Sequence, residues 1–105
     1  MDDRELLELA AKAAGIKHPG GEHCINGPAV WDCEALRWWR PLTDDGDALR
    51  LAVKLAIEIS PCPEHDSVLC EPKGSPDSTI TTEALDDYGT RRAIVRAAAA
   101  IGRAM

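Results

Sequence analysis

The feature that most constrains this chain is a segment that occurs twice in degenerate form. Each copy opens with an aspartate pair, at residues 44–45 and 86–87, and continues as an alanine-rich stretch that carries arginine. Aspartate side chains accept hydrogen bonds from the free amides at a helix start, so both pairs predict helix N-termini. Strand-like residues precede each pair. The repeat therefore predicts two strand-strand-helix units, and a further acidic pair at residues 2–3 predicts another helix at the start.

Apolar residues recur at helical spacing after each acidic pair, and short strand-like runs bounded by Gly, Pro, Ser or Asp lie between the helices. The expected fold is an α+β sandwich of order αββαββα, in which three helices pack on one four-stranded antiparallel sheet. The core-facing positions of the second and third helices are expected to include Leu51, Ala52, Val53, Leu55, Ile94, Ala97, Ala98 and Ile101. We expect helices at about residues 3–14, 44–56 and 87–103, and strands at about 29–33, 36–42, 67–71 and 78–84.

The segment at about residues 57–78 is the least regular part of the chain, with a high density of Pro, Cys and His. Residues 60–63, Ser-Pro-Cys-Pro, are expected to break any helix or strand, because proline lacks the backbone N–H and fixes φ. We treat this segment as an irregular insert within a single domain that spans residues 1–105.

Charge and hydropathy restrict the partners. Eighteen acidic and twelve basic side chains give a net charge of -6, which disfavours binding to nucleic acid or anionic lipid through the overall field. The start of the chain lacks the pattern of a signal peptide, and no run approaches the ~20 apolar residues of a membrane helix. We therefore expect a cytoplasmic protein without membrane contact, whose four cysteines stay reduced.

Three segments carry a resemblance to a known family. They are residues 39–55, Trp-x-Pro-Leu-Thr-Asp-Asp-Gly-Asp-Ala-Leu-Arg-Leu-Ala-Val-Lys-Leu, residues 90–98, Thr-Arg-Arg-Ala-Ile-Val-Arg-Ala-Ala, and the opening helix at 6–15. On these segments the chain resembles the phage ABA sandwich domain family, small proteins encoded by bacteriophages and prophages. The resemblance implies a phage genetic context in a bacterial host cell, a fold, and no defined catalytic residues.

Two clusters have the composition of metal sites. Asp44, Asp45 and Asp47 lie within four residues, but their spacing does not match a calcium loop, so helix capping is the favoured interpretation. Cysteine and histidine gather around residues 18–33 and again at Cys62, His65 and Cys70, which are the first zinc ligands to consider. No second clean ligand pair accompanies them. We therefore favour small apolar thiols and exposed histidines, with no metal and no cofactor.

Arginines form a stripe on the expected last helix. Arg92, Arg96 and Arg103 fall on one side because spacings of four and seven return to nearly the same angle. Such a stripe can hold an anion, such as a nucleotide phosphate, but it is also ordinary material for the solvated face of an amphipathic helix. We favour the solvated face and keep anion binding as the alternative.

Trp38 and Trp39 are neighbours on an expected strand, so their rings point to opposite faces. Simple alternation buries Trp38, whereas the family resemblance, which runs through Trp39, argues that Trp39 packs near the helix start. The ring that is left outside is a candidate partner-binding anchor, with Arg37 as its neighbour on the strand.

The sequence predicts a protein that acts by binding. No phosphate-cradling loop or nucleophile signature is present, so we expect no enzyme. The leading hypothesis is a phage or prophage accessory protein that inhibits a host macromolecule in an anti-defence role, for example as an anti-CRISPR protein. One alternative is sequestration of a small anionic ligand such as a signalling nucleotide, in a pocket formed by helix termini and arginines across a homodimer. The other is a structural or regulatory phage module.

Overall fold

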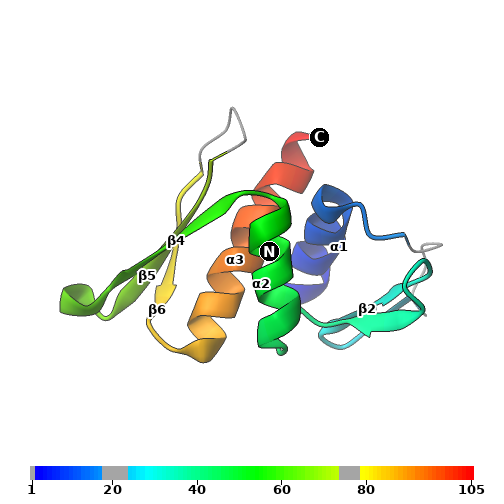
Figure 1. Cartoon of the computed structure of the whole chain (residues 1–105), viewed down its shortest axis with the longest axis horizontal. Coiled ribbons are helices and arrows are strands. Elements are labelled where there is room, and N and C mark those ends of the chain that lie inside the picture. Colours follow the sequence, from blue (N-terminus) through cyan, green and yellow to red (C-terminus); the bar gives the residue numbers. More distant parts are fainter. Residues whose placement is uncertain (1, 18–23, 74–78) are drawn as a thin grey trace.

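A computed structural model describes residues 2–17, 24–73 and 79–105, which form three helices and two small antiparallel sheets. The helices are α1 (Asp3–Ala14), α2 (Asp45–Lys54) and α3 (Asp87–Ala104). The first sheet, sheet A, contains β1 (Ile25–Asn26), β2 (Ala29–Asp32) and β3 (Arg37–Trp39). The second, sheet B, contains β4 (Ile57–Cys62), β5 (Ser67–Pro72) and β6 (Thr81–Ala84), with the short 3-10 helix η2 (Pro63–His65) between β4 and β5. Figure 1 shows the three helices in the middle of the molecule, with one sheet on either side.

The prediction of one four-stranded sheet is wrong, although the α+β class and the three helices are correct. Each copy of the repeat is a meander of three strands followed by a helix, and each meander forms its own sheet. Two strands were missed for different reasons. β1 has only two residues, which is too short for an alternating pattern, and β4 runs through the segment at 60–63 that was expected to break a strand.

Pro61 is tolerated in β4 because of where its missing N–H would point. The amide of Lys73 donates to the Ala56 carbonyl, 2.8 Å away, so antiparallel alternation makes Pro61 and Val68 a pair without mutual hydrogen bonds. The nitrogen of Pro61 therefore faces away from β5, and among the described residues β4 is an edge strand of sheet B. Edge positions of this kind are where proline is found in sheets.

The acidic pairs begin the helices as predicted. The side chains of Asp2, Asp44 and Asp86 are N-caps, and each accepts from the backbone N–H three residues later. At the other end of α1, Gly15 adopts the left-handed conformation, with φ 71°, and its N–H donates to α1 carbonyls. Local chemistry therefore determines where these helices start and where α1 stops.

The core lies mainly between the helices, and small side chains let α1 and α3 pack closely within it. Alanines on both α1 and α3 are fully buried, and an added Cβ on Gly102 would lie 1.9 Å from the Leu9 carbonyl oxygen. The backbones of α1 and α3 therefore approach more closely than any side chain at residue 102 would allow.

The expected core positions are confirmed except at Val53. Ile94 is buried, but Val53 is 74% exposed, so the prediction that Val53 supports the core is wrong. The remaining positions are buried or half-buried: Leu51, Ala52, Ala97 and Ala98 are buried, and Leu55 and Ile101 are half-buried. Val53 faces outward because α2 is buried along one side only, the side that carries Asp47, Ala48, Leu51 and Ala52.

Candidate functional site

The carboxylate of Asp47 is the centre of a polar cluster between α2 and β3. Its side chain is 1% exposed and accepts from Arg37 Nη1 and Nη2 at 2.8 and 3.1 Å, which is a bidentate pair. It also accepts from the Arg40 backbone N–H at 2.9 Å and from Arg50 Nη2 at 2.7 Å. The backbone N–H of Asp47 donates in turn to Asp44. This cluster fixes β3 against the first turn of α2.

The electrostatics of this cluster keep Asp47 charged. Burial acts to raise the pKa of Asp47, but the hydrogen bonds from Arg37, Arg50 and the Arg40 backbone outweigh it, so the pKa lies below its usual value. The same pairing raises the pKa of Arg37. Both charges are therefore present at neutral pH.

Sequence reasoning missed this cluster because it assigned Asp47 to the helix start. Arg50, three residues later on α2, was the one local signal of a partner. Arg37 lies ten residues before Asp47 on another element, beyond any local rule. Arg37 is also a predicted partner-binding residue; its guanidinium is paired with Asp47, and its side chain is 47% exposed.

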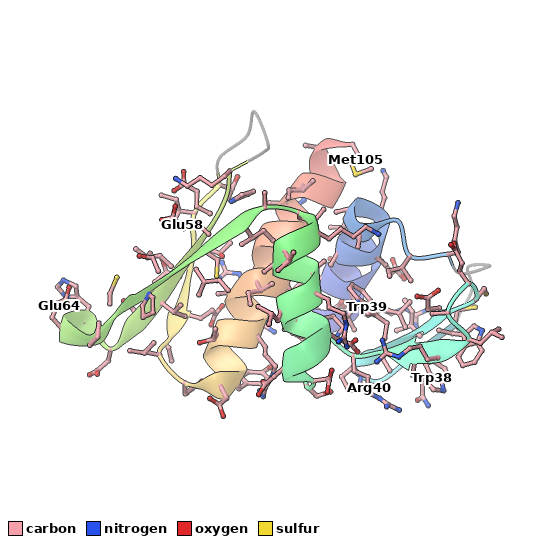
Figure 2. The ribbon with its side chains drawn as sticks, viewed as in Figure 1. Trp38, Trp39, Arg40, Glu58, Glu64 and Met105 are labelled. Carbon is pink, nitrogen blue, oxygen red and sulfur yellow. The ribbon has the colours of Figure 1, made fainter. Side chains whose placement is uncertain are left out.

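The two adjacent tryptophans have different surroundings. Trp39 is 5% exposed and belongs to the core, as the family resemblance predicted, whereas simple alternation had favoured burial of Trp38. Val30 and Trp39 form one buried cross-strand pair, so the next pair, Trp31 and Trp38, lies on the other face of sheet A. Figure 2 shows Trp39 directed toward the helices and Trp38 on the far side of the sheet.

The outer aromatic pair is ordered by contact between its rings. The centroids of Trp31 and Trp38 are 5.4 Å apart, and the rings meet edge to face at 68°. Both side chains are half-buried, and Leu36, in the turn between β2 and β3, is 73% exposed. We call Trp31, Leu36 and Trp38 the tryptophan face.

The possible zinc ligands are not brought together. β4 and β5 pair Cys62 with Ser67 and Cys70 with Ile59, so the two thiols lie three strand positions apart, about 10 Å at ~3.3 Å per residue. His65 is exposed at the end of η2. Across residues 2–17, 24–73 and 79–105, no three His, Cys, Asp or Glu side chains are grouped to hold a metal ion.

Within the described part of the chain, the remaining cysteines form no further ligand group. Burial raises the pKa of the Cys70 thiol to about 11, so Cys70 is a neutral core side chain at neutral pH. Cys24 is buried and Cys33 is exposed. His18 and His23 lie outside the described residues.

Two arginines of the α3 stripe, Arg92 and Arg96, are paired with carboxylates. Arg92 Nη1 lies 2.5 Å from an Asp3 oxygen, and Arg96 Nη1 lies 2.6 Å from a Glu83 oxygen. Arg96 and Arg103 also line a groove of about 190 Å³, together with Leu6, Thr79 and Thr81. An anionic ligand in this groove would have to compete with Glu83 for Arg96.

No protein-family model, curated protein sequence or solved structure matches this chain. The resemblance to the phage ABA sandwich domain family therefore stays a prediction that rests on the three quoted segments. None of the helices in the described part of the chain combines the length and the apolar character needed to cross a membrane.

Proposed function

We propose that this protein acts by binding a macromolecular partner through the tryptophan face. The observation that carries the proposal is the position of Trp31 and Trp38. Trp39 is buried in the core, whereas these two rings pack against each other on the outer face of sheet A. Large aromatic side chains outside a core are frequent anchors of protein interfaces.

The pairing of the two rings supports this role. Edge-to-face contact restricts both side chains before any partner arrives, so less conformational freedom is lost on binding. Leu36 adds apolar surface at the turn, where it adopts a left-handed conformation with φ 57°. Its side chain is 73% exposed, so it takes no part in the core and is open to contact with another molecule.

The charged groups favour binding over catalysis. The carboxylate of Asp47 accepts hydrogen bonds from Arg37 and Arg50, and the carboxylates of Asp3 and Glu83 form ion pairs with arginines of α3. These groups are paired within the fold, and the three carboxylates do not line one common cleft as a nucleophile and a base would.

The resemblance to phage proteins supplies the specific form of the proposal. We infer a phage or prophage protein in the cytoplasm of a bacterial host, where it blocks a surface of a host protein complex, such as a defence complex targeted by an anti-CRISPR protein. Its net charge of -6 favours a partner with a basic surface. Sequestration of a small anion is the weaker candidate, because Arg96 is already paired with Glu83.

The test compares Trp38→Ala with Tyr88→Ala, a matched loss of an aromatic ring that is 50% exposed at the start of α3. A partner is first isolated from host lysate with the parent chain, and its affinity for each variant is then measured by calorimetry. We expect Trp38→Ala to weaken binding by about 2 kcal/mol, roughly thirtyfold, and Tyr88→Ala to leave it unchanged.

Circular dichroism melts establish that both variants fold. A folded Trp38→Ala variant that binds like the parent would contradict the tryptophan face. A saturable rise in melting temperature with a nucleotide, lost in Arg96→Gln, would instead favour the anionic ligand.

A further inference from the structure

A second apolar surface lies between α2 and β4. The two elements diverge from the turn at residues 55–56, and Figure 1 shows the N-terminal half of α3 between them. Side chains of all three elements line a groove of about 260 Å³ there. Leu49 of α2, Ile59 of β4 and Ile94 of α3 provide its apolar lining, and Leu49 is 58% exposed. This volume is below the ~300–1,000 Å³ of sites that enclose a whole small molecule, and it suits individual side chains of a larger partner.

The edge of β4 beside this groove has free backbone groups. Glu58, Ser60 and Cys62 exchange hydrogen bonds with β5, so the backbone of Ile59 faces the open edge. In the described part of the chain, no backbone group bonds to that edge. Ile59 therefore offers both N–H and C=O to an added strand, while Pro61 offers its C=O alone.

One end of the groove carries acidic side chains. Asp45 and Asp87 line this end together with Arg91. Arg91 Nη1 lies 2.6 Å from Asp45, so this pair is neutral, and Asp87 has no ion pair within the described residues. A basic side chain of a bound partner would therefore complement Asp87.

We propose that this groove binds an extended, basic peptide segment of a partner protein, which adds to β4 as a further strand. An apolar side chain of the segment packs between Leu49 and Ile59, and a lysine or arginine lies beside Asp87. Backbone hydrogen bonds to Ile59 and Pro61 align the segment with β4. The residue opposite Pro61 can only donate a hydrogen bond, because Pro61 has a C=O but no N–H. The inference concerns a surface other than the tryptophan face and does not depend on it.

The probe is a fluorescent peptide of about eight residues in which valine and lysine alternate, long enough to follow the free edge at ~3.3 Å per residue. Fluorescence anisotropy measures its affinity for the full chain. Two further peptides serve as controls: one has glutamate in place of lysine, and one is N-methylated at the residues whose N–H groups face β4. We expect only the unmodified basic peptide to bind with saturation.

Two matched variants of α2 locate the site. Leu49→Lys places a charge in the groove, whereas Val53→Lys places the same charge one turn away, at a residue that is 74% exposed and does not line the groove. We expect Leu49→Lys to weaken peptide binding by about tenfold or more, and Val53→Lys to change it by less than about twofold. Asp87→Asn should weaken binding by about twofold to fivefold, with a smaller salt dependence.

Several results would overturn the inference. They are no saturable binding of the basic peptide, equal binding of the acidic or the N-methylated peptide, and equal effects of Leu49→Lys and Val53→Lys. A concentration-dependent dimer that Leu49→Lys dissociates would assign the groove to a second copy of this chain. Trp38→Ala tests whether this surface is separate from the tryptophan face, and we expect it to leave peptide binding unchanged. Loss of peptide binding in a folded Trp38→Ala variant would contradict binding at the groove.

Discussion

The two copies of the repeat begin alike and are buried differently. Asp44 and Asp86 cap α2 and α3 in the same way, each by accepting from the N–H three residues later. Beyond the caps the copies diverge, because α3 packs against α1, α2 and sheet B, whereas α2 has one outward side. The equivalent positions Val53 and Val95 are 74% and 0% exposed. Similar local sequence therefore produced similar helices, and the location of each helix determined which residues it buries.

The third residue after each cap shows the same divergence at atomic scale. In the first copy it is Asp47, whose buried carboxylate joins β3 to α2. In the second it is Gly89, where an added Cβ would lie 2.1 Å from the Ala84 carbonyl oxygen. Both positions hold the helix start against the preceding strand, one through charge and one through close backbone contact.

The largest expected effect is at the paired valines. Val95→Asp should prevent folding, because a buried, unpaired carboxylate costs several kcal/mol, comparable with the ~5–15 kcal/mol stability of a domain. Val53→Asp should lower the melting temperature by no more than about 2–4 °C, since exposed substitutions change stability by roughly 0.5 kcal/mol. Thermal melts followed by circular dichroism measure both. Equal effects would show that α2 and α3 are buried alike.

The next largest effect is at Asp47. Asp47→Asn removes the charge that joins Arg37 and Arg50, and we expect a loss of about 2–3 kcal/mol at pH 7, measured by urea unfolding. The loss stays below that of a fully buried pair because both arginine side chains are about half exposed or more. Glu64→Gln, at the exposed η2, is the control and should be neutral.

The pH dependence of the same variant checks the cause. The folded pKa of Asp47 is lowered, so its contribution is present above the unfolded value and is lost as the pH falls below about 4. The difference in unfolding free energy between the parent and Asp47→Asn should therefore shrink below about pH 4. A constant difference down to pH 2 would rule out the charge of Asp47 as the source.

The smallest expected effect is at Gly89. Gly89→Ala should cost about 1–3 kcal/mol, because its Cβ would press on the Ala84 carbonyl and the helix start must shift. Gly46→Ala, at the first turn of α2, is the matched control, and its new Cβ would meet only polar side-chain ends at 3.1–3.3 Å. A neutral Gly89→Ala would mean that the second helix start is not tightly held.

The sequence by itself determined the local parts of this protein. Aspartates at residues 2, 44 and 86 specify helix starts because a cap acts over three residues, and Gly15 ends α1 by adopting a conformation that other residues avoid. Trp31 and Trp38 were both visible as aromatic residues in predicted strands, but their pairing needed the register of β2 and β3.

Only the tertiary structure decided how these parts combine. Whether the strands form one sheet or two depends on whether the two meanders pair with each other, and because their residues lie far apart in the chain no local rule specifies it. The sequence predicts that Pro61 breaks a strand. In the structure its nitrogen lies on the free edge of β4, so all hydrogen bonds between β4 and β5 still form there. The partners of Asp47 and the exposure of Val53 follow from the placement of whole elements, because burial is a property of the packed molecule and not of a sequence pattern.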